Sequence, residues 1–278
     1  MISFRNTEKF DKDATIIFID KEQIKNKEFA FKNKNVEEGL KELVKADRFS
    51  GEKDEVFPLD VKKSGLVLFV GLGKAEDLSP TALRITVKKA IGSSFLKKAE
   101  EIELIPHNDD EKTVIAVIEG YLIGTYKWDK YKSKPKDDKG KELKEVFLVA
   151  PDKKEFSDAA LVCEGVNFTR RLVNDNADVV TSDLFEKEVK ELVKGHKNVT
   201  VEILNEKEMK AKGLNLHLAV NQGSNKEPKL IIIKYNGGSA KDEYTAILGK
   251  GMTFDTGGLN LKPTNHIESM RIDMSGAG

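Results

Sequence analysis

The chain has 278 residues, of which 39% are hydrophobic and 34% are charged. These values describe a water-soluble globular protein with room for two ordinary domains. Basic and acidic residues number 47 each, so the net charge of zero gives no general attraction to nucleic acid or to an anionic membrane. The single cysteine, Cys163, excludes an intrachain disulfide. The first ten residues have no apolar core and no run of about 18 apolar residues occurs, which predicts a cytoplasmic protein without a membrane span.

The first part of the sequence alternates short apolar runs with segments of helical period. Runs rich in β-branched residues predict strands at 14–19, 66–70, 102–105 and 146–149. Helices are predicted over 36–44, from Ser79-Pro80 to Ile91, and over 114–125. Strands separated by helices favour an α/β domain with largely parallel pairing, which we place at residues 1–152. Its charge-rich stretch at 130–144 has almost nothing to bury and is predicted to be a surface loop.

The second part, residues 153–278, predicts another α/β domain. A helix over 156–173 leads into it, and a helix with Phe185, Val189 and Leu192 on one face ends near Gly195 as its C-cap. Strands are predicted at 199–204, where apolar and polar residues alternate, and at 230–233 and 246–248, where the apolar runs are continuous. Continuous runs are typical of central strands that are covered on both faces.

Three other features of the sequence could suggest a functional site, but none has the residue spacing or local motif that such a site requires. The run from Gly71 to Lys74 lacks the spacing of a phosphate-binding loop or a dinucleotide fingerprint, so a turn at the end of a strand is predicted. The four histidines are scattered without zinc-ligand spacing. Cys163 lies within a predicted helix and is expected to be a buried structural thiol.

Charged residues near the end of the sequence lie among closely spaced glycines. Lys250 follows a predicted strand, Asp255 precedes a glycine pair, and Lys262 and Asp273 come after it. Glycines at this density indicate tight turns or a close approach to a ligand, and open α/β sheets bind ligands at the carboxyl ends of strands. Two aspartates and two lysines in this frame make a candidate site for a divalent cation and a polar substrate. From spacing alone, surface ion pairs on loops are an equally good interpretation.

The ordered string of residues resembles the leucyl aminopeptidase family, the two-metal exopeptidases also called cytosol aminopeptidases. The matching strings are GKGMTFDTGGLNLKP, from Gly249 to Pro263, and MRIDMSGA, from Met270 to Ala277. Weaker similarities extend the resemblance backwards over the whole chain. The resemblance is strong after about residue 165 and diffuse before it.

The resemblance implies a metal-dependent aminopeptidase that releases leucine-like residues from peptides with a free N-terminus. Lys250, Asp255 and Asp273 match the family's metal ligands for two divalent ions, zinc or manganese, with magnesium and cobalt also compatible. Lys262 matches the catalytic lysine, which contacts the substrate and stabilises the oxyanion when a hydroxide generated between the ions attacks the carbonyl. Met270 matches a residue of the substrate side-chain pocket. An ordinary core methionine is the alternative interpretation.

The same resemblance implies a small N-terminal α/β domain at 1–152 without catalytic residues. Residues 153–278 would form a three-layer α/β/α metallo-exopeptidase domain that is incomplete at the C-terminus. A cytoplasmic homo-hexamer is expected, with no membrane partner and no nucleic acid. The family's remaining metal ligands lie in an NTDAEGR-like stretch that does not occur in this sequence. We therefore expect a partial ligand set, and exposed apolar surface at 230–233 and 246–248.

Three explanations of the missing stretch stay open: a fragment of a longer gene product, an artificially shortened chain, or a degenerate relative that has lost catalysis. The alternative function is therefore a catalytically inactive fragment or a non-enzymatic binding or assembly protein, including one that binds DNA. The neutral net charge argues against the DNA-binding version.

Overall fold

The computed structural model describes residues 2–62, 64–133, 141–238 and 243–278. The chain divides into two compact units, Met1–Asn167 and Phe168–Gly278, here called unit 1 and unit 2. This division falls within the long helix α5 (Lys154–Asn174), whereas the boundary predicted from the sequence lies just before that helix. The domain boundary at 152/153 stays a prediction.

A six-stranded sheet forms the centre of unit 1, in the order β1-β6-β5-β2-β4-β3. Neighbouring strands pair in parallel except β3, which is antiparallel to β4. This arrangement confirms the predicted α/β class with largely parallel pairing. All residues of β2 are buried, and Ala14 is aligned with Leu66 on one side and with Ile102 on the other. The strands are β1 (Ile2–Arg5), β2 (Ala14–Ile19), β3 (Val56–Val61), β4 (Gly65–Gly71), β5 (Glu101–Ile105) and β6 (Glu145–Val149).

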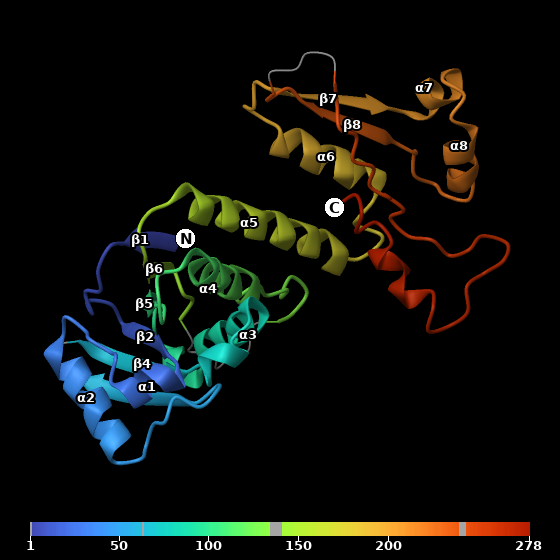
Figure 1. Cartoon of the computed structure of the whole chain (residues 1–278). Helices are drawn as coiled ribbons and strands as arrows, with labels where there is room; N and C mark the ends of the chain where they lie inside the picture. Colours follow the sequence, from blue (N-terminus) through green and yellow to red (C-terminus); the bar gives the residue numbers. More distant parts are fainter. Residues whose placement is uncertain (1, 63, 134–140, 239–242) are drawn as a thin grey trace. The chain divides into compact units, whose positions relative to one another are not determined.

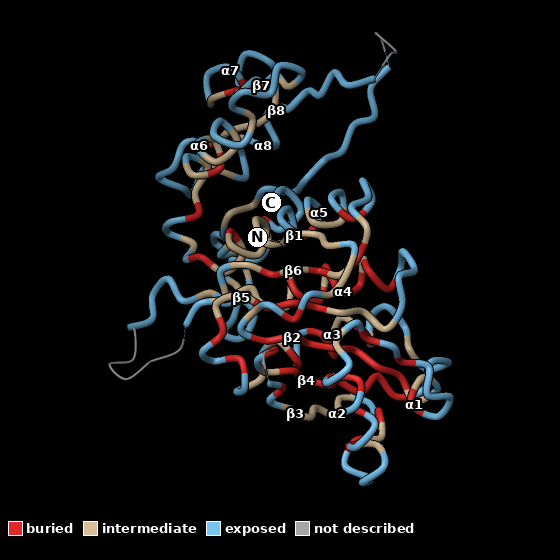
Figure 2. Tube along the Cα trace, turned by 90° about the vertical axis from the view of Figure 1, so that its left-hand side faces the viewer, coloured by how far each residue is buried: buried red, intermediate tan, exposed pale blue. Residues whose placement is uncertain are grey.

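Helices cover both faces of this sheet (Figure 1), and the buried segments include its strands β2 and β4 (Figure 2). Side chains alternate along β2, so that Ile17 and Ile19 pack under α1 and α2, whereas Ile16 and Phe18 pack under α3, α4 and the start of α5. Ser79 Oγ accepts a hydrogen bond from the Ala82 N–H at 3.2 Å, which confirms the helix start predicted there. The helices are α1 (Lys21–Asn26), α2 (Lys34–Lys45), α3 (Pro80–Ile91) and α4 (Glu111–Gly124), with short 3-10 helices η1 (Ala75–Asp77) and η2 (Ser94–Leu96).

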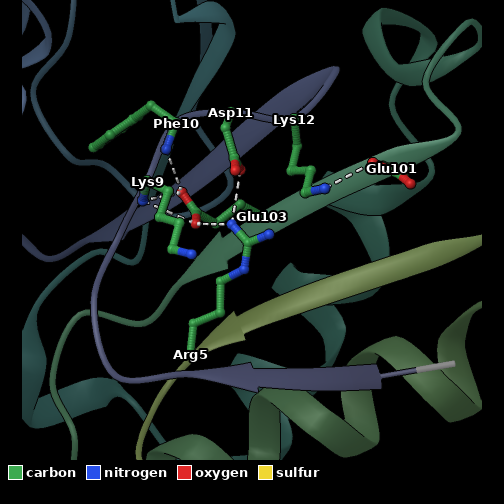
Figure 3. Close-up of polar contacts among 7 residues, drawn as sticks. All are labelled: Arg5, Lys9, Phe10, Asp11, Lys12, Glu101 and Glu103. Carbon is green, nitrogen blue, oxygen red and sulfur yellow. Dashed lines mark hydrogen bonds and ion pairs between the residues drawn. The ribbon is translucent and has the colours of Figure 1, made fainter.

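The segment between β1 and β2 is held by the buried carboxylate of Glu103 on β5 (Figure 3). Glu103 accepts hydrogen bonds from the backbone N–H groups of Lys9 and Phe10, each at 3.1 Å, and from Arg5 Nη1 at 3.2 Å. Arg5 also pairs with Asp11 at 2.7 Å. Because a buried carboxylate must find donors, this network fixes the path of the chain across the sheet.

Two sequence patterns in unit 1 have the structural roles that were predicted. A Cβ atom on Gly71 would lie 2.1 Å from the Glu52 carbonyl oxygen, and Gly73 has a φ of +78°. The run from Gly71 to Lys74 is therefore a tight turn packed against a neighbouring loop. Cys163 is a buried free thiol. Of the loop predicted at 130–144, residues 134–140 lie outside the described residues, and the remainder has no helix or strand.

Unit 2 contains a two-stranded antiparallel sheet, in which Val199 is aligned with Tyr235. Helix α6 lies along this sheet (Figure 1), and Phe185 of α6 shares a small core with Ile231. The helix ends at Leu192 with Val193 as its C-cap, so the prediction that Gly195 is the cap was wrong. The elements are α6 (Ser182–Leu192), β7 (Val199–Leu204), α7 (Glu206–Ala211), α8 (Asn215–Asn221), β8 (Leu230–Tyr235) and the 3-10 helix η3 (Glu268–Ile272).

One strand predicted in unit 2 does not form. Residues 246–248 have no regular structure, and Ile247 and Leu248 are 93% and 91% exposed. No neighbouring strand among the described residues pairs with this run, and an apolar run without such a partner has no ladder hydrogen bonds. The neighbouring prediction of a central strand at 230–233 was half right, since β8 forms but Ile233 is 49% exposed. The expected exposure of apolar surface at both places is confirmed.

Candidate metal and substrate site

The segment that carries the predicted site, residues 243–278, is irregular apart from η3 and is organised by two ion pairs. Lys250 Nζ donates a hydrogen bond to Asp273 Oδ1 at 2.7 Å. Lys262 Nζ donates to Asp255 Oδ2 at 2.5 Å and to the Asp255 carbonyl oxygen at 3.1 Å. The structure therefore brings the four charged residues together as two close pairs, one of which joins residues far apart in the segment.

A glycine turn places Lys262 against Asp255. Gly257 has a φ of +91°, and a Cβ atom there would lie 2.3 Å from the Asn260 carbonyl oxygen. Its N–H donates to Asp255 Oδ1 at 2.8 Å, while the Lys262 N–H donates to the Thr256 carbonyl oxygen at 2.8 Å. Only glycine fits both the left-handed conformation and the close contact, so the turn explains one member of the predicted glycine pair.

The charges of this segment favour an ionised Asp255. The hydrogen bond from Lys262 holds the pKa of the Asp255 carboxyl below its ordinary value, and the Gly257 N–H and the charge of Lys250 act in the same direction. Because Lys250 influences Asp255 in this way, the two ion pairs belong to one electrostatic cluster. Their side chains are partly accessible, from 21% exposed for Asp273 to 62% for Lys250.

The donor atoms fit part of a metal site. Two ligand atoms bound at right angles to one cation, each at about 2.1 Å, lie about 3 Å apart, and Lys250 Nζ and Asp273 Oδ1 are 2.7 Å apart. The amine must lose its proton to offer a lone pair, so a cation would replace the proton that now joins the pair. Among the described residues, no group of three or more His, Cys, Asp or Glu side chains is placed to hold a metal ion. The described part of the chain therefore supplies a partial ligand set.

The two methionines of this segment differ in environment. Met270, the predicted pocket residue, lies in η3 and is half-buried. Met274 directly follows Asp273 and is fully buried in the core of unit 2 with Leu172, Val180 and Phe185. Met274 therefore anchors the Asp273 segment to the rest of the unit. Met274 was not among the predicted site residues, although it is a large apolar residue between Asp273 and Ser275.

Comparisons with known proteins match both parts of the chain. Residues 167–278 match the family model described as "Cytosol aminopeptidase family, catalytic domain", and residues 16–135 match the "Cytosol aminopeptidase family, N-terminal domain". A protein of Protochlamydia amoebophila named "Probable cytosol aminopeptidase" is 35% identical over 240 residues, which cover 82% of this chain and 48% of that protein.

Two solved structures share the fold. A tomato leucine aminopeptidase mutant superposes with a TM-score of 0.74 and 24% identity, covering 99% of this chain and 57% of that one. The bottromycin maturation enzyme BotP, in complex with Mn, has a TM-score of 0.71 and 23% identity, covering 96% and 54%. The chain thus spans about half the length of the proteins it matches. Within the described residues, no helix is both long enough and apolar enough to cross a bilayer.

Proposed function

The chain belongs to the cytosol aminopeptidase family, and from this premise we propose that the whole protein is a metal-dependent aminopeptidase that releases leucine-like residues from the N-termini of peptides. The observation that most supports the proposal is the clustering of the four charged side chains in the part of the chain that matches the catalytic domain. Lys250, Asp255, Lys262 and Asp273 form two ion pairs there, and these are the residues that the family resemblance implies for the site.

In this proposal Lys250, Asp255 and Asp273 hold two divalent ions. Zinc, manganese, magnesium and cobalt are all compatible with carboxylate and amine ligands, and the BotP neighbour was solved with Mn. Bound ions of this kind polarise a carbonyl group and lower the pKa of water. The hydrogen bond from Lys262 lowers the pKa of the Asp255 carboxyl and so favours the ionised form that binds a cation.

Lys262 acts on the substrate. The Lys262 side chain is 28% exposed and its ammonium group is held by Asp255, so the residue lies within the cluster and its side chain is partly accessible to a substrate. A protonated lysine in this place donates a hydrogen bond to the carbonyl oxygen of the scissile peptide and stabilises negative charge as it develops there. Met270 contributes to the pocket for the first side chain of the substrate. Peptides with a free N-terminus are the proposed partners.

The family resemblance extends the proposal to the organisation of the protein. Residues 1–152 form the N-terminal domain and residues 153–278 the first portion of the catalytic domain, within a cytoplasmic homo-hexamer that binds no nucleic acid. The name of the relatives, cytosol aminopeptidase, supports the location. Size-exclusion chromatography with light scattering tests the hexamer.

The activity is tested with leucine p-nitroanilide in the presence of Mn²⁺ or Zn²⁺. The 278-residue chain is compared with a longer version read through to the next downstream stop codon of its gene. The proposal expects hydrolysis by the longer version, its loss on chelation, and no cleavage of the N-acetylated substrate, because an aminopeptidase recognises the free amine. Equal cleavage of the blocked substrate, or a folded longer version without any activity, would contradict it.

A further inference from the structure

We infer, in an argument that rests on the proposed function, that Gly249 is a positioning residue of the metal site. Its missing side chain lets the backbone before Lys250 pack directly on the backbone that follows Asp273. This backbone contact, here called the Gly249–Gly276 crossing, sets the separation of the Lys250 amine and the Asp273 carboxylate.

The crossing leaves no room for a side chain at Gly249. A Cβ atom there would lie 2.3 Å from the Gly276 carbonyl oxygen, 2.7 Å from the Ala277 Cα and 2.9 Å from the Gly276 carbonyl carbon. All three are main-chain atoms, which cannot rotate out of the way as a flexible side chain can. Gly249 lies outside the left-handed φ region, so the requirement for glycine is one of space and not of backbone conformation.

The crossing lies beside the ligand pair. Lys250 directly follows Gly249, and its Nζ donates to Asp273 Oδ1 at 2.7 Å. Asp273 is tied to the other side of the crossing, because its neighbour Met274 is buried in the core and the Ala277 N–H donates to the Met274 carbonyl oxygen at 3.0 Å. A methyl group on Gly249 would have to push the two segments apart by roughly 1 Å to reach ordinary contact, whereas metal–ligand distances tolerate only about 0.2 Å.

Replacing neighbouring glycines by alanine should disturb the Gly249–Gly276 crossing to different extents, because the added Cβ atom has more room at some of these positions than at others. A Cβ atom on Gly276 would lie 3.2 Å from the Lys250 backbone nitrogen, a tight contact that a small shift relieves. A Cβ atom on Gly251 would lie 3.5 Å from the Ala277 Cβ, which is ordinary van der Waals contact. Gly251 flanks Lys250 on its other side, so Gly251→Ala is a matched control for Gly249→Ala. The crossing should be disrupted most by Gly249→Ala, less by Gly276→Ala and least by Gly251→Ala.

The first test needs no metal. A water-soluble carbodiimide activates the Asp273 carboxylate, the Lys250 amine attacks it to form an amide, and the carbodiimide leaves as a urea. This zero-length crosslink forms only between groups in contact and is quantified by peptide mass spectrometry. We expect the yield to fall roughly tenfold in Gly249→Ala, since a displacement of about 1 Å is large for a reaction between positioned groups. Gly251→Ala should retain the wild-type yield, and Gly276→Ala should lie between.

A wild-type yield in Gly249→Ala, or an equal loss in Gly251→Ala, would overturn the inference. Circular dichroism on each variant shows whether it folds. Should Gly249→Ala not fold, the comparison of Gly276→Ala with Gly251→Ala decides, because both substitutions leave contacts that the fold can accommodate.

The second test is Mn²⁺ affinity, followed by electron paramagnetic resonance of the free ion. We expect Gly249→Ala to weaken binding roughly tenfold or more, as changes that misplace metal ligands commonly do, with Gly251→Ala unchanged. Failure of the wild-type chain and of its longer version to bind Mn²⁺ would contradict the proposed function. The crosslinking series would then still decide the role of Gly249, so the two proposals fail separately.

Discussion

Replacing Glu103 by glutamine should destabilise unit 1 by about 3 kcal/mol. The Glu103 side chain is fully buried and accepts hydrogen bonds from Lys9, Phe10 and Arg5. Glutamine has nearly the same shape, but its NH₂ group would face one of these donors, so at least one bond is lost. A buried bond to a charged group contributes about 1.5–3 kcal/mol, and leaving the Arg5 charge without a buried counter-ion adds to the loss.

Trp128, the only tryptophan, lies in unit 1 and reports its unfolding by fluorescence during denaturation. A loss of about 3 kcal/mol corresponds to a fall in Tm of roughly 6–12 °C for a unit of this size. The matched control is Glu101→Gln, because Glu101 is on the same strand but is 44% exposed in its pair with Lys12, and exposed pairs contribute less than about 1 kcal/mol. A Glu103→Gln variant no less stable than Glu101→Gln would refute the view that Glu103 fixes the segment between β1 and β2.

Three further predictions concern acid stability, thiol reactivity and the lysine ligand. Hydrogen bonds from Lys141 and Lys144 lower the pKa of Glu100 to about 2. Its contribution to folding is therefore present above the ordinary value of 4.5 and is lost as the pH falls toward 2. Glu100→Gln should flatten the acid side of the stability curve at low salt, and an unchanged curve would count against this. Burial raises the pKa of the Cys163 thiol to about 11, so a thiol reagent should label the native chain only as fast as it unfolds; rapid labelling would show the thiol to be accessible. Lys250→Arg should keep the positive charge beside Asp273 and the stability of the chain but abolish Mn²⁺ binding, because guanidinium does not deprotonate in proteins; retained binding would exclude Lys250 as a ligand.

The elements predicted well are those whose local sequence is sufficient. The alternating run of β7 was placed with its correct bounds, and Ser79 as N-cap with Pro80 as the first helical residue located the start of α3. The two strands that were missed depend on distant partners. β1 is a four-residue strand that pairs only with β6, and β3 contains Pro58, which suits the edge position that β3 occupies but weakens any strand prediction. The strand wrongly predicted at 246–248 failed for the opposite reason, since its local pattern is strong and its partners are absent from the described structure.

The candidate site likewise combines features that the local sequence predicts with features that depend on distant contacts. The identity of Lys250, Asp255, Lys262 and Asp273 as candidates came from an ordered string of residues, and the glycine turn at Gly257 is a local consequence of that string. Their pairing could not be predicted, because the contact between Lys250 and Asp273 depends on how two segments cross, which no local pattern specifies. The buried Glu103 was missed because an acidic residue within an apolar strand has meaning only when its partners are known.

Catalysis by the longer version of the protein, with and without Lys262, tests the central claim most directly. We predict that Lys262→Ala lowers kcat for leucine p-nitroanilide roughly 10²–10³-fold, the loss expected when an oxyanion donor is removed, while Mn²⁺ binding is retained. A kcat unchanged by Lys262→Ala, or a folded longer version that binds Mn²⁺ and cleaves nothing, would contradict the claim that these charged residues form an aminopeptidase site.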